Sequence, residues 1–215
     1  MTLFVRLLHA EDKSTELLWA ARNGGKNCFV VEPSDFKHIP SSPFAYWITS
    51  GIRNVFKKMG PYDNESTGRT ARCGLGTLDD FRFLRLCWET KFSRKGWASY
   101  YHGGVFSPFY DEFPLVVRWQ DDGLEVKSYV TMKVGSASRK VQGEDHYFHE
   151  GFVFSRRTKA LAPKFMPRGG IFSTGGQAGF APPEELPASI ALLSSIVCSF
   201  FISVCQGRTG DAAQF

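Results

Sequence analysis

The sequence has no Cys-x-x-Cys pair, and its cysteines are odd in number. The five are Cys28, Cys73, Cys87, Cys198 and Cys205. A disulfide framework needs even pairing, and a zinc ribbon needs closely spaced thiolates, so both are disfavoured. The first eight residues also lack the long apolar region and small-residue cleavage site of a secretory signal. Together these absences predict a protein of the reducing cytoplasm.

A second absence concerns methyl transfer. The sequence contains no Asn/Asp-Pro-Pro-aromatic segment, and its single Pro-Pro pair, Pro182-Pro183, precedes two glutamates. An enzyme that extrudes adenine from duplex DNA needs such a loop to grip the base. The segment Cys73–Gly76 holds only a short Gly-x-Gly, too brief for a nucleotide-binding loop. We therefore expect no catalysis, no catalytic residues and no cofactor in this chain alone.

Metal-binding patterns are weak. Glu125 and Lys127, preceded by Asp111, resemble the acidic-x-Lys half of a metal-dependent nuclease site. The same residues also suit the solvent face of a hairpin, so the nuclease is kept as an alternative. His146 and His149 stand three residues apart, whereas zinc ligands on a helix usually stand four apart. No metal site is predicted.

The composition is that of a globular protein. Hydrophobic residues make up 43% and charged residues 22% of the 215 residues, which excludes a disordered chain and a polytopic membrane protein. Aromatic residues reach 15%, with 20 Phe, and are expected mainly in the core. A chain of this length can bury such a core without staples.

The segment 188–205 carries no charge. A membrane span is one interpretation, and a buried helix is the other. Ser195, Ser199 and Ser203 recur every four residues and form a polar stripe that a lipid-facing span does not need. We therefore expect a buried amphipathic helix and no membrane partner.

Apolar periodicity and turn residues predict an α+β fold. Helices are expected at 11–22 and at 43–60, the second with Ser42 as its N-cap and Pro43 in its first turn. The segment 60–77 is predicted as a loop. Strands are expected at 1–8, 151–154 and 170–172, and a hairpin is expected to pair 115–119 with 124–130 around Asp122-Gly123.

Basic charge is concentrated in the second half of the chain. The net charge is +5, yet residues 127–168 alone hold nine basic residues against three acidic ones. Clustered basic charge is typical of proteins that bind a polyanion. A solvated basic face is the alternative, and charge alone does not separate the two.

Several segments, in order, match the motifs of one known family. Residues 36–47 resemble the segment F-x-x-I-P-G-S-P-x-A-Y-W, with Ser41 in place of Gly. Residues 74–83 and 103–123 resemble G-x-x-T-x-D-x-x-R-F and a GG…Y…V-x-W-x-x-D-G hairpin, and residues 166–172 and 192–195 resemble the close of the same region. In these segments the chain resembles BREX-type phage-exclusion adenine-specific DNA methyltransferases, which are related to type II restriction-modification methylases.

The resemblance implies a division of labour. Residues 1–60 are expected to be a helical connector that follows a methylase domain, which binds S-adenosylmethionine in the full-length enzyme. Residues 61–215 are expected to be a β-rich, antiparallel or mixed-sheet DNA target-recognition domain that closes with a buried C-terminal helix. The implied partners are double-stranded DNA, the methylase catalytic domain and other phage-defence subunits. A protein-interaction module of a phage-defence complex is a further alternative.

The residues expected to contact DNA are basic. Arg82 is the first candidate for a base contact because it lies beside the loop that opens the recognition domain, although an ion pair with Asp79 or Asp80 is an equal alternative. The full predicted set is Arg69, Arg72, Arg82, Arg139, Lys140, Arg156, Arg157, Lys164 and Arg168.

Overall fold

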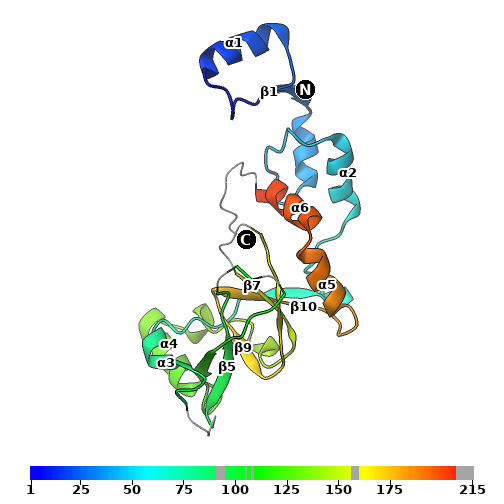
Figure 1. Ribbon diagram of the computed structural model, residues 1–215. Helices are drawn as coiled ribbons and strands as arrows, with labels where there is room; N and C mark the ends of the chain where they lie inside the picture. Colours follow the sequence, from blue (N-terminus) through cyan, green and yellow to red (C-terminus); the bar gives the residue numbers. More distant parts are fainter. Residues whose placement is uncertain (91–94, 105, 108, 156–159, 207–215) are drawn as a thin grey trace. The chain divides into compact units, whose positions relative to one another are not determined.

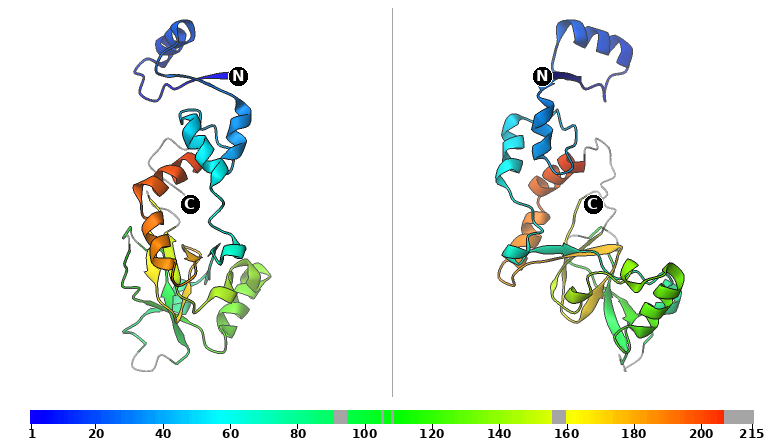
Figure 2. Two further views of the ribbon diagram at one scale, coloured as in Figure 1. Left: turned by 90° about the vertical axis from the view of Figure 1, so that its right-hand side faces the viewer. Right: turned by 180° about the vertical axis from the view of Figure 1, so that it is seen from behind.

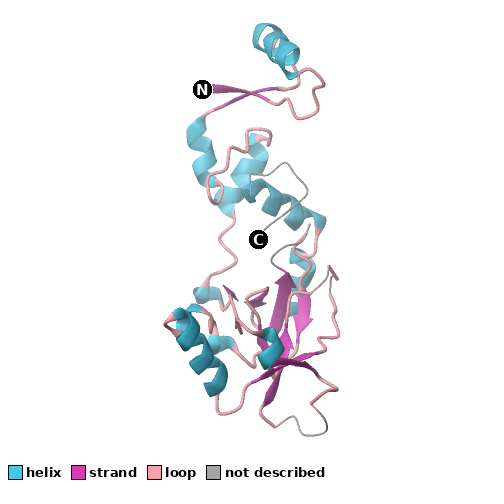
Figure 3. Cartoon of the chain, turned by 90° about the vertical axis from the view of Figure 1, so that its left-hand side faces the viewer, coloured by secondary structure: helices cyan, strands magenta, loops and turns pink. Residues whose placement is uncertain are grey.

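A computed structural model describes residues 1–90, 95–104, 106–107, 109–155 and 160–206 of the chain (Figure 1). The chain divides into two units. The first unit contains Met1–Gly60 and the last helix from Phe200 onward, and the second contains Pro61–Ser199. Strands concentrate in the second unit (Figure 3). The α+β class predicted from the sequence is confirmed.

The first unit opens with a strand, a helix and a second strand. Strand β1 (Thr2–Val5) pairs antiparallel with β2 (Cys28–Val31), and α1 (Lys13–Asn23) lies between them in sequence. The carboxylate of Asp12 accepts two backbone N–H groups of the first turn and so begins α1. Gly24, at φ 68°, ends it. The predicted strand and helix are confirmed here.

The next predicted helix begins later than expected. After the 3₁₀ helix η1 (Pro33–His38), helix α2 spans only Ser50–Lys58, and the Oγ1 atom of Thr49 caps it. Ser42 has a φ of 47°, and the helix begins only at Ser50, so the predicted role of Ser42 as its N-cap is wrong. The intervening residues form turns whose apolar side chains complete a small core. That core contains Ile39, Ala45, Ile48 and Val204.

Two four-stranded sheets form the second unit. One is antiparallel, in the order β3 (Thr70–Arg72), β10 (Gly176–Phe180), β7 (Gly151–Ser155) and β8 (Lys164–Met166). The other is mixed, in the order β4 (Leu84–Leu86), β6 (Leu115–Arg118), β5 (Trp97–Tyr101) and β9 (Gly170–Phe172), with β5 and β9 parallel. The strands expected at 151–154 and 170–172 are confirmed, whereas β3 and the 3₁₀ helix η2 (Glu65–Thr67) lie in the segment predicted as a loop.

The predicted hairpin is wrong in its second arm. Residues Leu124–Val134 form helix α4, and β6 pairs with β4 and β5 instead. Gly123 does adopt the expected positive φ, 71°, but it begins the helix. Val126 and Val130, four residues apart, are fully buried, which is the spacing of one helix face. Helix α4 lies at the periphery of the strands in both views of Figure 2 (light green), near the short helix α3 (Asp80–Phe83) of Figure 1.

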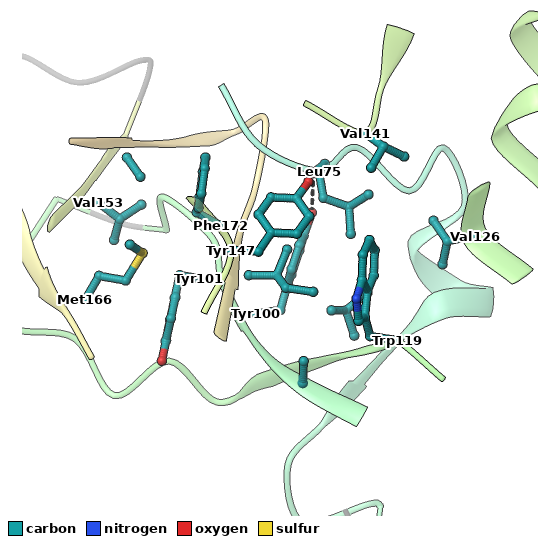
Figure 4. Close-up of a cluster of buried hydrophobic side chains, with 14 of the residues drawn as sticks. Leu75, Tyr100, Tyr101, Trp119, Val126, Val141, Tyr147, Val153, Met166 and Phe172 are labelled. Atoms are coloured by element: carbon teal, nitrogen blue, oxygen red, sulfur yellow. Dashed lines mark hydrogen bonds between the residues drawn. The ribbon is translucent and has the colours of Figure 1, made fainter. Parts of the chain in front are cut away.

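Aromatic rings fill the core of the second unit (Figure 4). Tyr147 packs edge-on against both Trp119 and Phe172, with ring centroids 5.4 Å apart in each pair. The Tyr100 hydroxyl donates to the backbone oxygen of Leu75 at 2.8 Å, the bond drawn as a dashed line. Burial raises the pKa of both tyrosine hydroxyls well above the ordinary range. The core therefore anchors the segments that carry the basic residues.

The C-terminal segment is helical, as predicted, but it forms two helices. Helix α5 spans Leu186–Leu193 and α6 spans Ile196–Gln206. The Oγ atom of Ser195 accepts from a backbone N–H of α6 at 3.1 Å, which accounts for the break. Burial is incomplete, since Ile196 is 85% exposed. Among the described residues no single helix is long and apolar enough to span a membrane, although the bent α5–α6 pair together has the length and composition.

Candidate nucleic-acid interface

The predicted DNA-contacting residues differ in whether a carboxylate partner neutralises their positive charge. Seven of the nine lie in the described part of the chain, whereas Arg156 and Arg157 lie outside it. Ion pairs with carboxylates engage Arg69, Arg72, Arg82, Lys164 and Arg168. Arg139 and Lys140 make no ion pair with any described residue.

Lys164 lies in the interior of the second unit, which does not favour its predicted contact with DNA. Its side chain is 1% exposed on β8, and its ammonium lies 2.5 Å from Oδ2 of Asp111. It also donates to the backbone oxygen of Gly103 at 2.9 Å. A lysine buried in this way is held by its partners and is poorly placed to reach a phosphate.

Three arginines are paired at the surface. Arg69 lies 2.7 Å from Glu185, and Arg168 lies 3.1 Å from Glu150. Arg72 contacts two carboxylates, those of Asp63 and Glu65. A hydrogen bond from Thr70 and the nearby Arg72 lower the pKa of Asp63. Exposed pairs of this kind contribute little to stability and leave little net positive charge for a polyanion.

Arg82 has a partner, but neither of the two expected. Its guanidinium contacts Glu125 on α4, with Nη2 to Oε1 at 2.9 Å and Nε to Oε1 at 3.3 Å. Asp79 instead accepts the backbone N–H of Arg82 and caps α3. The guanidinium also lies over the rings of Phe83 and Tyr129, 5.1 and 5.0 Å from their centroids. The predicted ion pair with Asp79 or Asp80 is therefore wrong.

Arg139 and Lys140 are positioned by the end of α4. Gly135, at φ 84°, ends the helix, and the 3₁₀ helix η3 (Ala137–Arg139) follows. The guanidinium of Arg139 donates to the backbone oxygen of Val134 at 2.9 Å. The backbone oxygen of Lys140 accepts from Gly76 at 2.8 Å, which fixes this turn to the segment before α3.

These two cations line a hollow of about 530 Å³, which we call the basic groove. Its lining contains no carboxylate, so the formal charge of the wall is positive. An adjoining hollow of about 320 Å³ shares Lys140, His102 and Thr174 with it. Asp80 lines that second hollow, hydrogen-bonded to the Thr77 hydroxyl. The basic groove is lined by Cys73, His102, Gly104, Arg139, Lys140, Gln142, Ser155, Thr174 and Gly175.

Two glycine pairs, Gly103-Gly104 and Gly175-Gly176, let two backbone segments at this groove approach each other closely. A Cβ atom on Gly103 would lie 2.6 Å from the backbone oxygen of Gly175, so only glycine fits there. A Cβ atom on Gly175 would lie 2.8 Å from Nε2 of His102. The Ser155 hydroxyl holds the Gly103 oxygen at 2.5 Å. His102 and Gly175 were not predicted as groove residues, although the Gly175-Gly176 pair in the sequence is a signal for a close backbone approach.

A third hollow, about 580 Å³ in volume, lies beside α4. We call it the arginine–glutamate groove, because Glu125 contacts Arg82 on one side and Arg118 on the other. The hydrogen bond from Arg82, aided by Arg118, lowers the pKa of Glu125. Its lining comprises Arg82, Arg118, Gln120, Asp121, Leu124, Glu125, Ser128, Tyr129 and Met132.

The geometry does not favour the nuclease alternative. Glu125 is paired with arginines, and Asp111 is paired with Lys164. Lys127 contacts Asp122 at 2.7 Å and is also paired with Glu144. In the described residues no group of three or more His, Cys, Asp or Glu side chains could hold a metal ion. The residues that a nuclease would bring together each have another partner.

The chain was compared with known protein families and with known proteins. No protein-family model matches the chain. The chain is similar to an adenine-specific methyltransferase, BrxX, of Escherichia coli O9:H4 (strain HS), with 29% identity over 236 aligned residues. The alignment covers 99% of this chain and only 18% of that protein's length. The similarity thus extends along almost the whole of this chain, which spans less than a fifth of the length of that methyltransferase.

Proposed function

We propose that this chain binds double-stranded DNA as the target-recognition region of an adenine-specific DNA methyltransferase in a phage-defence system. The observation that carries the proposal is the basic groove, in which Arg139 and Lys140 face a hollow without a carboxylate. A groove of this kind attracts a polyanion. The similarity to BrxX supports DNA as that polyanion, because the relative is an adenine-specific methyltransferase.

In this proposal the basic groove supplies affinity and register. Arg139 and Lys140 contact backbone phosphates and displace condensed counterions, which makes binding strong at low salt and independent of sequence. The polar side chains of His102, Gln142 and Thr174 add hydrogen bonds to phosphate or sugar oxygens. Arg156 and Arg157 remain predicted phosphate contacts.

The rest of the methyltransferase would supply the chemistry. We propose that methyl transfer and S-adenosylmethionine binding belong to a catalytic domain outside residues 1–215, with residues 1–60 as the connector. The second unit then selects the DNA on which that domain acts. The similarity to only 18% of a long methyltransferase supports such a division of labour.

Binding of a labelled duplex, followed by fluorescence anisotropy, tests the proposal. The wild-type chain should bind random-sequence duplex with a dissociation constant on the order of 10⁻⁴ to 10⁻⁶ M at physiological salt, and more tightly at low salt. Arg139→Ala combined with Lys140→Ala should weaken binding, whereas Arg69→Ala combined with Arg168→Ala removes the same charge from paired sites and should change it less.

Two other outcomes would each favour one of the alternative functions. Failure of the wild-type chain to bind duplex at low salt would contradict the proposal and favour the protein-interaction module. Magnesium-dependent cleavage of the duplex, lost in Glu125→Ala, would restore the nuclease alternative.

A further inference from the structure

The arginine–glutamate groove differs from the basic groove in its charge. Arg82 and Arg118 are balanced by Glu125 and Asp121, so the lining carries no formal net charge. A phosphate gains little from such a surface. A group that presents both donors and acceptors gains more, because Gln120 offers both on the same wall.

Glu125 holds the two arginines from different elements. Arg82 comes from α3, Arg118 from the end of β6, and Glu125 from the first turn of α4. Oε1 of Glu125 takes the two bonds from Arg82, whereas Oε2 takes Nε of Arg118 at 2.8 Å. One carboxylate thus fixes both guanidinium groups at the groove.

Donors remain for a ligand. Arg118 uses Nε for its ion pair, and its two Nη atoms have no hydrogen-bond partner among the described residues. Arg82 likewise has no partner at Nη1 within the described part of the chain, and its guanidinium lies 5.1 and 5.0 Å from the ring centroids of Phe83 and Tyr129. About half of each side chain is exposed, with values of 48% for Arg82 and 44% for Arg118. The guanidinium groups of Arg82 and Arg118 are therefore held in place and remain accessible to a ligand.

We propose that Arg82 and Arg118 read the major-groove edge of a guanine in the DNA target, with Glu125 as the positioning residue. The inference rests on the proposed function. Guanine presents two adjacent acceptors, O6 and N7, and the arginine fork matches them with two parallel donors. A neutral lining suits a base edge, because it adds no unspecific attraction for phosphates.

Glu125 acts by orientation. Without its carboxylate the two guanidinium groups repel each other, and both side chains regain rotamer freedom that binding must then restrict. Lysine cannot replace either arginine, since an ammonium cannot bond a base edge with two parallel donors.

The test separates discrimination from affinity. A duplex is selected from a random pool with the wild-type chain, and each G·C pair in it is then replaced by A·T. Arg82→Lys and Arg118→Lys keep the charge, so binding to unselected duplex and its salt dependence should not change. Discrimination at one G·C pair should fall on the order of 10-fold to 100-fold.

Glu125→Gln should give a smaller loss at the same pair, with only a small drop in the thermal unfolding midpoint, because half-exposed ion pairs contribute little to stability. The matched control is Arg168→Lys, which alters an exposed arginine paired with Glu150 outside the groove. Two independent arginine variants protect the test against misfolding of either one.

Each outcome bears on a different claim. Selective loss at one G·C pair in the arginine variants, with the control unchanged, supports the inference. The inference is wrong if both variants keep the base preference, or if the wild-type chain binds DNA without any base preference. In either case the proposed function still holds. No DNA binding by the wild-type chain overturns the proposed function and the inference with it.

Discussion

The ammonium of Lys164 lies 2.5 Å from Oδ2 of Asp111, fifty-three residues earlier in the chain. Lys164 also donates to the backbone oxygen of Gly103, one residue from the lining of the basic groove. The pair connects β8 to the His102–Gly104 segment. A lysine in the most basic stretch of the sequence thus supports the groove from behind and does not face it.

Lys164→Met should destabilise the second unit by about 3 kcal/mol, because it leaves Asp111 without its buried partner. Arg168→Met is the control, since its exposed pair with Glu150 should cost less than about 1 kcal/mol. Urea denaturation of the two variants measures the difference. Adding Asp111→Leu to Lys164→Met should recover part of the loss, and equal losses in the two single variants would show that Lys164 is not structural.

Two buried tyrosines should respond oppositely to loss of their hydroxyl. Tyr100→Phe removes a bond to the Leu75 oxygen and should cost about 1 kcal/mol. The Tyr147 hydroxyl is buried and has no hydrogen-bond partner among the described residues, so Tyr147→Phe should be neutral or stabilising. Thermal unfolding of both variants provides the comparison. A larger loss from Tyr147→Phe than from Tyr100→Phe would contradict the packing described here.

The start of α4 should depend on glycine more than its end. Gly123 and Gly135 both have positive φ, 71° and 84°. A Cβ atom on Gly123 would lie 2.7 Å from the Trp119 ring, whereas one on Gly135 would have nothing within 4 Å. Gly135→Ala should therefore cost about 1 to 2 kcal/mol for its backbone alone, and Gly123→Ala should cost more. Denaturant midpoints that reverse this order would argue against the helix.

The turn before α4 shows which part of the fold the sequence predicts. Asp122-Gly123 correctly indicated positive φ, but the same pair can end a strand and begin a helix. The following residues alternate well enough for a strand, and only the burial of Val126 and Val130 on one side selects the helix. Likewise Ser42 satisfied the local rules for a cap, while its backbone is left-handed. Tertiary packing settles what local patterns leave open.

The site was predictable only in its charge. Residue type and clustering led to the prediction of Arg139 and Lys140, which line the basic groove, and of Lys164, which belongs to the same stretch and is buried. Arg82 could not be matched to Glu125, because the pair joins residues forty-three positions apart. His102 and Gly175 reach the basic groove through the approach of two glycine segments. Such contacts depend on sheet order, which the sequence pattern does not state.

The carboxylate of Glu125 should titrate below the ordinary value for glutamate, because Arg82 and then Arg118 stabilise its charged form. Since the pKa is lower in the folded state, the contribution to stability is present above the ordinary value and is lost as pH falls through the folded one. With the side chain 42% exposed, it should stay below about 1 kcal/mol. An NMR titration should show the pKa rising in Arg82→Gln; an unchanged pKa would contradict the ion pair.

The salt dependence of duplex binding shows whether the basic groove contacts DNA phosphates. Each phosphate contact adds about 0.9 to the slope of log affinity against log salt. Arg139→Ala combined with Lys140→Ala should therefore flatten the wild-type slope by about 1.8 and weaken binding to all sequences alike. If the double variant kept both the wild-type affinity and the wild-type slope at low salt, the basic groove would not bind DNA phosphates and the account would be wrong.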